Sequence, residues 1–478
     1  MRRKFPAVVA GLAIALGGTG LAAIQATPAV AGFVPVSSLQ PDSLWAAMHT
    51  SYAVPAGAVF VAPSGSDAGA GSQAAPFKTL AFALSKVKSG GTVVMRGGTY
   101  REGASGYANG GTNYVLNPTG VTIQNYPGET VWMDGTQVVS SWTKASTTDY
   151  KVSWSTPSLC AGQFYSRSFS SQTSSGPCSY GDAVGGSGSI GDPLMVFVNG
   201  TEIKEVASAS KLTSSTFYYD WSARQLHLGF DPSGKTVEVT KFAQALALFK
   251  PTNVTIRGIG FRRYASNQYD NATAGALLLN SGSNVLLEHV AITGNAGGGL
   301  MSWQTRGLTV RSSWLSSNGA NGFNFSGSAQ KRASDPSLRD DLVIEYSRVD
   351  SNNADSYGVA CTYACTSAGF KGAGVIGANV RYSTFNYNGG QRASGLWFDL
   401  GSQQVNIYGN KMALNARHGV VYEVSDQGII ASNLVKENGW GSSVNGGGYG
   451  IMMGSANTKV YNNTITDNKQ GVFLYDDA

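Results

Sequence analysis

Short apolar runs recur along the C-terminal half of the chain, separated by turns rich in Gly, Asn and Ser. Examples of the first series are V-T-I-R (254–257), L-T-V-R (308–311) and V-N-I-Y (405–408). Runs of three to five residues with alternating side chains are typical of short β-strands. Their recurrence at start-to-start intervals of roughly 23–36 residues indicates a stack of repeated coils.

A second series of strands begins at a glycine, and the residue that follows each glycine is apolar. These apolar residues are Leu300, Phe323, Phe370, Leu396, Val420, Ile451 and Val472. Because side chains alternate along a strand, this position is predicted to face the core. Positions two and four after each glycine are then predicted to face outward.

Several short strands in each coil, with no helical pattern, predict an all-β fold: a right-handed, single-stranded parallel β-helix over residues 250–478. Asn410, Asn433 and Asn463 fall at equivalent turns and are expected to form a hydrogen-bonded ladder. A leucine-rich repeat and a β-propeller are the weaker alternatives, because their signatures are missing. The pattern stops in mid-coil, where an uncapped β-helix would expose a strand edge, so we expect either that the C-terminal end of the β-helix is truncated or that a further domain is absent.

Two regions precede these coils. Residues 56–135 combine strands with an amphipathic helix over 79–87, which predicts an N-terminal cap followed by the first coils. Residues 140–245 contain strand-like runs without the stacking repeat. They are predicted to form a small antiparallel β insertion.

The first 31 residues have the pattern of a secretory signal peptide. A basic start (Arg2, Arg3 and Lys4) precedes an apolar run, and a small-residue cleavage motif ends at Ala31. We therefore expect cleavage after Ala31 and a secreted, extracellular protein. No later run is apolar for long enough to predict a membrane span, so no membrane association is expected.

Composition supports a β-rich exported protein. Charged residues make up 13% of the chain and 62 of its 478 residues are Gly, which argues against helix bundles and coiled coils. Removing the signal peptide lowers the formal net charge from +6 to +3, too little to indicate a nucleic-acid partner. The four cysteines are expected to form two local disulfides, Cys160–Cys178 and Cys361–Cys365.

The outward positions of the glycine series carry the candidate chemistry. Asp399 and Glu423 occupy position four of successive coils. Parallel strands lie about 4.8 Å apart, so these carboxyl groups are predicted to lie roughly 5–6 Å apart. A retaining glycosidase needs a carboxylate pair about 5–5.5 Å apart. Trp397 is expected to lie exposed beside Asp399 and to stack on a sugar ring.

Other outward or adjacent residues are assigned more weakly. Lys371, His418, Trp303 and Asn324 are candidate substrate-binding residues on the same face. Each also has a structural alternative: Lys371 as a solvated or ion-paired lysine, and His418 as a turn residue that could orient Glu423. No metal or other cofactor is required by this interpretation, although stacked carboxylates could instead bind Ca²⁺.

The motifs G-L-W-F-D-L (395–400) and G-V-V-Y-E-V-S (419–425) resemble β-helix glycosidases around glycoside hydrolase family 120, the β-xylosidases. The resemblance implies that Asp399 is the nucleophile and Glu423 the acid/base. V-F-V-A-P-S-G-S-D (59–67) and G-G-T-Y-R-E (97–102) resemble the cap of secreted β-helix glycosidases and polysaccharide lyases. Such a protein is implied to act on a polysaccharide or oligosaccharide.

Two other functions remain open from the sequence. Lys371, in A-G-F-K-G, resembles the lysine base of calcium-dependent β-helix pectate lyases, although the dense Asp cluster of those enzymes is missing. The third alternative is a non-catalytic carbohydrate-binding β-helix. The sugar, its linkage, endo or exo action and the oligomeric state are not indicated by the sequence.

Overall fold

The computed structural model describes most of the chain beyond residue 49. The described residues are 50–103, 114–155, 194–206, 208–220, 222–266, 275–332, 334–354, 367–390, 393–441 and 447–476. The expected signal peptide and the four cysteines lie outside these ranges, so both remain predictions.

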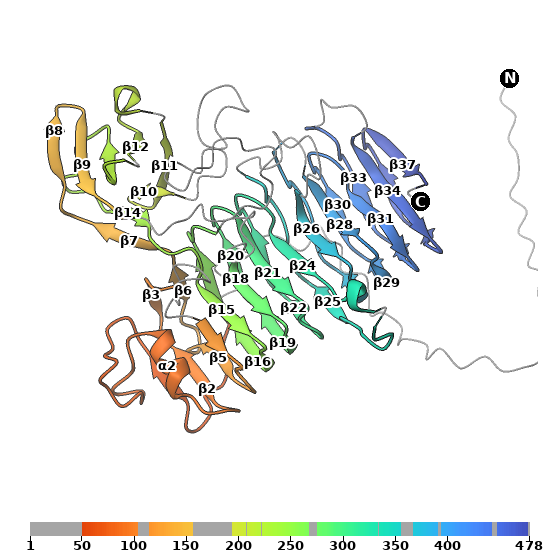
Figure 1. The fold of residues 1–478 in the computed structure, drawn as a ribbon, viewed down its shortest axis with the longest axis horizontal. Coiled ribbons are helices and arrows are strands. Elements are labelled where there is room, and N and C mark those ends of the chain that lie inside the picture. The colour runs from red at the N-terminus through yellow and green to blue at the C-terminus, as the bar shows by residue number, and fades with distance from the viewer. Residues whose placement is uncertain are drawn as a thin grey trace, which may run out of the picture. The chain divides into compact units, whose positions relative to one another are not determined.

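Parallel strands stack in three columns. Apart from its first strand, the first column runs from green to blue in Figure 1, and it carries the candidate site. Its strands are β4 (Tyr114–Leu116), β15 (Leu246–Phe249), β18 (Gly275–Asn280), β21 (Gly298–Trp303), β24 (Phe323–Ser326), β26 (Ala368–Ala373), β28 (Ser394–Asp399), β31 (Val420–Asp426), β34 (Tyr449–Ala456) and β37 (Gln470–Leu474). Every pair of neighbours in this column is parallel, as in a β-helix.

The other two columns complete the coils. The second consists of β1 (Val59–Val61), β2 (Thr92–Met95), β5 (Thr122–Asn125), β16 (Thr252–Arg257), β19 (Ser283–Glu288), β22 (Thr309–Arg311), β25 (Leu342–Glu345), β27 (Ile376–Arg381), β29 (Gln403–Tyr408), β32 (Ile429–Ala431) and β35 (Lys459–Tyr461). The third consists of β3 (Gly98–Tyr100), β6 (Val131–Asp134), β17 (Ile259–Arg262), β20 (Ala291–Thr293), β23 (Trp314–Ser316), β30 (Lys411–Ala413), β33 (Leu434–Lys436) and β36 (Thr464–Thr466). Single parallel bridges link β23 to β30 across the coils between them.

The core lies inside the coils, as the alternation predicts. Leu396, Val420 and Ile451 are in register with one another and fully buried. Position three after each glycine also faces inward, where the ring of Phe398 lies 5.1 Å from that of Phe370. The predicted all-β, parallel β-helix with an inward apolar column is therefore confirmed. Val472 differs from its equivalents because it is 49% exposed.

An asparagine ladder explains the glycines of the glycine series from Gly299 to Gly450. The predicted ladder forms: Asn410 donates to Asn433 at 3.1 Å, and Asn433 donates to Asn463 at 2.9 Å. A second ladder runs beneath the glycines, through Asn295, Asn318, Asn352, Asn388, Asn415, Asn438 and Asn468. A Cβ atom on Gly395 would lie 2.7 Å from the side-chain nitrogen of Asn415, so there is no room for a side chain.

We expect Gly395→Ala to lower the free energy of unfolding by about 1–3 kcal/mol, because overpacking shifts the ladder and the neighbouring backbone. Gly471→Ala is the matched control, since a Cβ atom at this equivalent position meets nothing within 4 Å. Chemical denaturation of both variants measures the difference. Equal stability of the two variants would contradict this account of the glycine series.

A short helix, α2 (Leu80–Lys86), packs beside the first strands. The Thr79 hydroxyl accepts a hydrogen bond from the Phe82 N–H at 3.2 Å, which caps the helix. Leu80 and Ala83 on its apolar face are buried. Two 3₁₀ turns, η4 (Ala209–Lys211) and η5 (Ala329–Lys331), are also present. None of the helices in the described ranges is long and apolar enough to cross a membrane.

An eight-stranded sheet is inserted between two successive coils. In sheet order its strands are β7 (Thr136–Val139), β14 (Val237–Thr240), β10 (Val196–Val198), β11 (Thr201–Glu205), β12 (Thr216–Asp220), β13 (Gln225–Leu228), β9 (Asp149–Ser153) and β8 (Thr143–Ser146). All of its strand pairs are antiparallel except β11–β12. β15 and β17 of the coil that follows the insertion pair with β4 and β6 of the coil that precedes it. The stack of coils therefore continues past the insertion.

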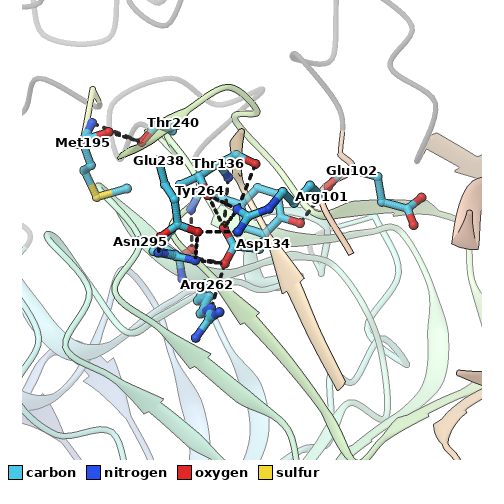
Figure 2. Close-up of polar contacts among 11 residues, drawn as sticks. Arg101, Glu102, Asp134, Thr136, Met195, Glu238, Thr240, Arg262, Tyr264 and Asn295 are labelled. Atoms are coloured by element: carbon cyan, nitrogen blue, oxygen red, sulfur yellow. Dashed lines mark hydrogen bonds and ion pairs between the residues drawn. The ribbon is translucent and has the colours of Figure 1, made fainter. Parts of the chain in front are cut away.

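A buried ion-pair cluster joins the inserted sheet to the coils (Figure 2). Asp134, at the end of β6, accepts hydrogen bonds from Arg262 at 2.8 Å and from Arg263 Nε at 2.9 Å. Arg263 also donates to Glu238 of the inserted strand β14 at 2.6 Å, and Arg101 contacts Glu238. Asp134 is fully buried and Glu238 is 6% exposed. Although burial opposes ionisation, the arginines hold the pKa of both carboxyl groups below their ordinary values.

Candidate active site

Strands β26, β28 and β31 place the candidate residues on the outer face of the first column. Lys371 is in register with Trp397, and Ala373 with Asp399. Phe398 pairs with Tyr422, so the next residues of the two strands are Asp399 and Glu423. The two carboxylates thus occupy equivalent places in consecutive strands, as the repeat predicts.

Lys371 lies against both Trp397 and Asp399. Its ammonium group forms an ion pair with Asp399 Oδ2 and sits 3.2 Å from the centroid of the Trp397 ring. The Lys371 and Asp399 side chains are only 8% and 13% exposed. Lys371 is therefore the ion-paired lysine of the two structural alternatives, not the solvated one.

The expected exposure of Trp397 is wrong. The residue is 8% exposed and packs with Ala368 and Val421 in a cluster separate from the main core. The Lys371 ammonium covers one face of its ring, because a cation is attracted to the electron-rich face of an indole. Its predicted contact with substrate stays a prediction.

The electrostatics of Lys371 are unusual for a lysine. Burial lowers its pKa from the ordinary value to about 8, against the opposing effects of Asp399 and Glu423. The ammonium group is therefore mostly protonated at neutral pH and loses its proton in the weakly alkaline range. Arg417 also lowers the pKa of Lys371, which indicates a further positive charge near the site.

Glu423 lies at a local irregularity of β31. It is in register with Gly454, whereas Ser425 is in register with Ser455, so Val424 is an extra residue. Val424 has a φ of 45°, which is rare for a β-branched residue. Such bulges redirect neighbouring side chains and are common next to active sites. The half-buried carboxylate of Glu423 accepts a hydrogen bond from the Tyr475 hydroxyl through Oε2.

His418 belongs to a stack of aromatic rings that leads to Glu423. Its ring lies 5.3 Å from that of Tyr449, and the stack continues through Phe473 to Tyr475. The Tyr449 N–H donates to His418 Nδ1 at 3.2 Å, which assigns the proton of the neutral ring to Nε2. Burial lowers the pKa of His418 to about 3, with a smaller effect of Arg417, so the ring stays neutral. Its link to Glu423 is thus indirect.

Asn324 and Trp303 lie on the same face, toward the N-terminal coils. Asn324 is in register with Lys371, is buried, and accepts a hydrogen bond from Asn321 at 2.8 Å. Trp303 is half-buried and stands at the end of β21, three strands before Asp399. The structure therefore brings Lys371, Trp397, Asp399 and Glu423 together and places Trp303 farther along the column.

The positive charge beside Asp399 is the ammonium group of Lys371. Within the described ranges, no group of three or more His, Cys, Asp or Glu side chains is placed to hold a metal ion. Asp399 receives hydrogen bonds from Lys371 and from the Leu400 N–H, the latter at 2.7 Å. These hydrogen bonds occupy both carboxylate oxygens of Asp399, which are the atoms that would coordinate a Ca²⁺ ion.

One residue near the carboxylates was missed by the sequence analysis. Tyr475 stands at position four of the last glycine strand, the position that carries Asp399 and Glu423 in earlier coils. Its contact with Glu423 spans two coils and passes over Gly454, where an added Cβ atom would lie 2.6 Å from the Tyr475 ring. The missing side chain at Gly454 was the signal that could have indicated this contact.

Comparisons with known proteins agree with this architecture. The family described as "Right handed beta helix region" matches residues 363–478. A curated relative, "Uncharacterized protein YwoF" of Bacillus subtilis (strain 168), is 36% identical over 83 residues, which are 17% of this chain and 17% of that protein. The matched segment thus spans about a sixth of the relative.

Two solved structures resemble the whole arrangement more broadly. The structure of XylC in complex with xylose gives a TM-score of 0.59 at 14% identity, covering 85% of this chain and 71% of that one. A structure named "Glycoside hydrolase" gives a TM-score of 0.53 at 12% identity, covering 86% of this chain and 97% of that one. The chain therefore has the right-handed parallel β-helix fold found in these carbohydrate-active proteins.

Proposed function

We propose that this protein is a secreted glycoside hydrolase that cleaves oligosaccharides or polysaccharides with retention of anomeric configuration. The observation that carries the proposal is the equivalent placement of Asp399 and Glu423, directly after the paired residues Phe398 and Tyr422 of neighbouring strands. The fold-level similarity to XylC, which was solved with xylose, supports a xylose-containing substrate as the first to test.

The two carboxylates divide the reaction between them. The Asp399 carboxylate attacks the anomeric carbon while the Glu423 carboxylic acid gives its proton to the leaving oxygen. The glycosidic C–O bond breaks as the bond to Asp399 forms. In the second step Glu423 takes a proton from water, the water oxygen attacks the same carbon, and Asp399 is released.

Neighbouring residues position these groups. The ion pair with Lys371 and the hydrogen bond from the Leu400 N–H fix the orientation of the Asp399 carboxylate. The Tyr475 hydroxyl donates a hydrogen bond to Oε2 of Glu423. The proton that Glu423 gives to the leaving oxygen is therefore carried on Oε1. The Trp397 ring packs against the Lys371 ammonium and excludes water from the Lys371–Asp399 ion pair.

Product analysis tests the proposal. Incubation with aryl β-xylosides and xylo-oligosaccharides is expected to release saturated reducing sugars, and proton NMR at early times is expected to show the retained anomer. Inverted product, or no cleavage of any glycoside in a broad panel, would overturn it.

A second candidate is a polysaccharide lyase in which Lys371 is the base. The observation in its favour is the lowered pKa of Lys371, because a neutral lysine amine can abstract the proton next to a uronate carboxylate. Such an enzyme would give an unsaturated product, with a characteristic ultraviolet absorbance, and would require added Ca²⁺. A non-catalytic carbohydrate-binding protein would give neither product.

The pH profile separates the two enzymes, because they need opposite protonation states of Lys371. A hydrolase that uses the Lys371–Asp399 ion pair is expected to lose activity as the pH rises through about 8, where the lysine becomes neutral. A lyase is expected to gain activity over the same range. We expect a falling limb in kcat/KM that disappears in Lys371→Met, whose side chain has similar length but no charge. A rising limb would favour the lyase.

A further inference from the structure

The outer face beside the carboxylates contains a row of residues in which two small side chains lie between Asp399 and a tryptophan. Position four of each glycine strand reads Trp303, Ser326, Ala373 and Asp399 in consecutive strands, and each pair is in register. All four residues are half-buried, whereas Lys371 and Trp397 at position two are buried. The side chains of Lys371 and Trp397 at position two are thus buried in this face, whereas the residues at position four are accessible to solvent.

A polar segment is fixed along one side of this row. The Gly327 N–H donates to the Ala373 carbonyl at 2.8 Å, and the Ala329 N–H donates to the Gly374 carbonyl at 2.9 Å. Lys331 donates to Gln304, next to Trp303, at 2.5 Å. The segment 327–332 therefore follows the row and forms a polar border along it.

The two ends of the row differ. Three strand steps of about 4.8 Å place Trp303 about 14 Å from Asp399, with only Ser326 and Ala373 between them. On the other side of the carboxylates, the Tyr475 ring lies over Gly454 and fills the next equivalent position. The row of position-four residues therefore continues from Asp399 toward Trp303, whereas on the other side it ends at the Tyr475 ring.

We propose that the row from Asp399 to Trp303 binds an extended neutral oligosaccharide, with successive sugar units over Ala373 and Ser326 and a distal unit stacked on Trp303. This inference deepens the proposed function and rests on it for the position of the cleaved bond. Stacked strands have a spacing close to that of pyranose units in an extended chain, so one sugar unit per strand is the natural register. An aromatic ring provides the apolar platform on which the face of a sugar packs.

Calorimetric binding of xylobiose through xylohexaose tests the inference. The measurement uses Asp399→Asn protein, so that the ligand is not consumed. Affinity is expected to rise about tenfold from xylobiose to the longer ligands that reach Trp303, and Trp303→Ala is expected to remove that rise. Trp314→Ala is the matched control, because this half-buried tryptophan belongs to the same coil but lies in the third column.

A second variant fills the row without changing Trp303. Ala373→Leu places a larger side chain between Asp399 and Trp303 and is expected to remove the same dependence on length, with circular dichroism to check folding. Affinity that does not depend on length, or a dependence that survives both variants, would overturn the inference, as would failure of all these ligands to bind. Hydrolysis of aryl xylosides by the wild-type protein is measured separately. Length-dependent binding without hydrolysis would contradict the proposed function but would support the row as an oligosaccharide-binding site.

Discussion

Asp399→Asn is expected to lower kcat on an aryl glycoside by at least about 10³, because nucleophile and acid each supply several kcal/mol of the barrier reduction. The amide cannot form the glycosyl–enzyme bond, and it pairs more weakly with Lys371, whose ammonium now faces a neutral group. The loss is expected with good and poor leaving groups alike, since both need the nucleophile. Steady-state kinetics on two aryl glycosides of different leaving-group acidity measure it.

Glu423→Gln is expected to behave differently. It removes the proton donor, so substrates with poor leaving groups lose about as much as in Asp399→Asn, while the bond-breaking step of an activated aryl glycoside is largely spared. A burst of the aryl product followed by slow turnover is then expected, because water still lacks its base in the second step. This contrast assigns the two roles separately.

Asp426→Asn is the matched control for both variants. Asp426 lies on β31 with Glu423, but its carboxylate accepts hydrogen bonds from the Gln427 N–H and the Asn457 side chain, both at 2.9 Å. Its activity is expected to equal that of the wild type. If Asp399→Asn and Glu423→Gln also keep full activity while Lys371→Met is inactive, the lyase alternative replaces the hydrolase. If all three keep full activity, the site lies elsewhere on the β-helix.

The repeat alone was sufficient to predict the coils and the side-chain directions. A glycine followed by an apolar residue specifies both the start of the strand and its inward face, so the pattern of residues places Leu396 and Asp399 on opposite faces of their strand. The reason is local, since alternation depends only on the strand itself. Counting four residues from Gly395 and from Gly419 likewise placed Asp399 and Glu423 at equivalent positions in successive coils.

What the sequence could not show depends on contacts between coils and on side-chain packing. Trp397 was expected to be exposed, but the long side chain of Lys371 from the preceding coil folds over its ring. The Tyr475–Glu423 contact spans 52 residues and depends on a missing side chain at Gly454. Such contacts depend on the three-dimensional course of long side chains, which periodicity does not encode.

The ion-pair cluster at the insertion is the clearest example of a feature hidden from the sequence. Arg101, Asp134, Glu238 and Arg263 come from separate segments and form no motif along the chain. They meet because the chain leaves the coils after β6 and returns to pair β17 with it. Figure 2 shows Arg101 and Arg262 beside the Asp134 and Glu238 carboxylates, and Arg263 donates hydrogen bonds to both acids. Three arginines face two acids, so each acid is needed to balance the charge.

Asp134→Asn is therefore expected to be the most destabilising of the conservative changes considered. It leaves Arg262 and Arg263 without their shared carboxylate at a position that is fully buried. Removing one partner of a buried ion pair typically costs about 3–5 kcal/mol, because the remaining charge is left uncompensated. The measurement is the free energy of unfolding in a chemical denaturant, followed by circular dichroism.

Asp341→Asn provides the matched comparison, since Asp341 pairs with Arg339 at 2.9 Å but both side chains are largely exposed, at 57% and 46%. Water screens this pair, so its loss is expected to cost at most about 1 kcal/mol. A difference of several kcal/mol between the two Asp→Asn variants would show that the cluster stabilises the junction between the inserted sheet and the coils. Equal effects would mean that the arginines recover their solvation when Asp134 is lost, and that the junction is held by the apolar packing and strand pairing around it.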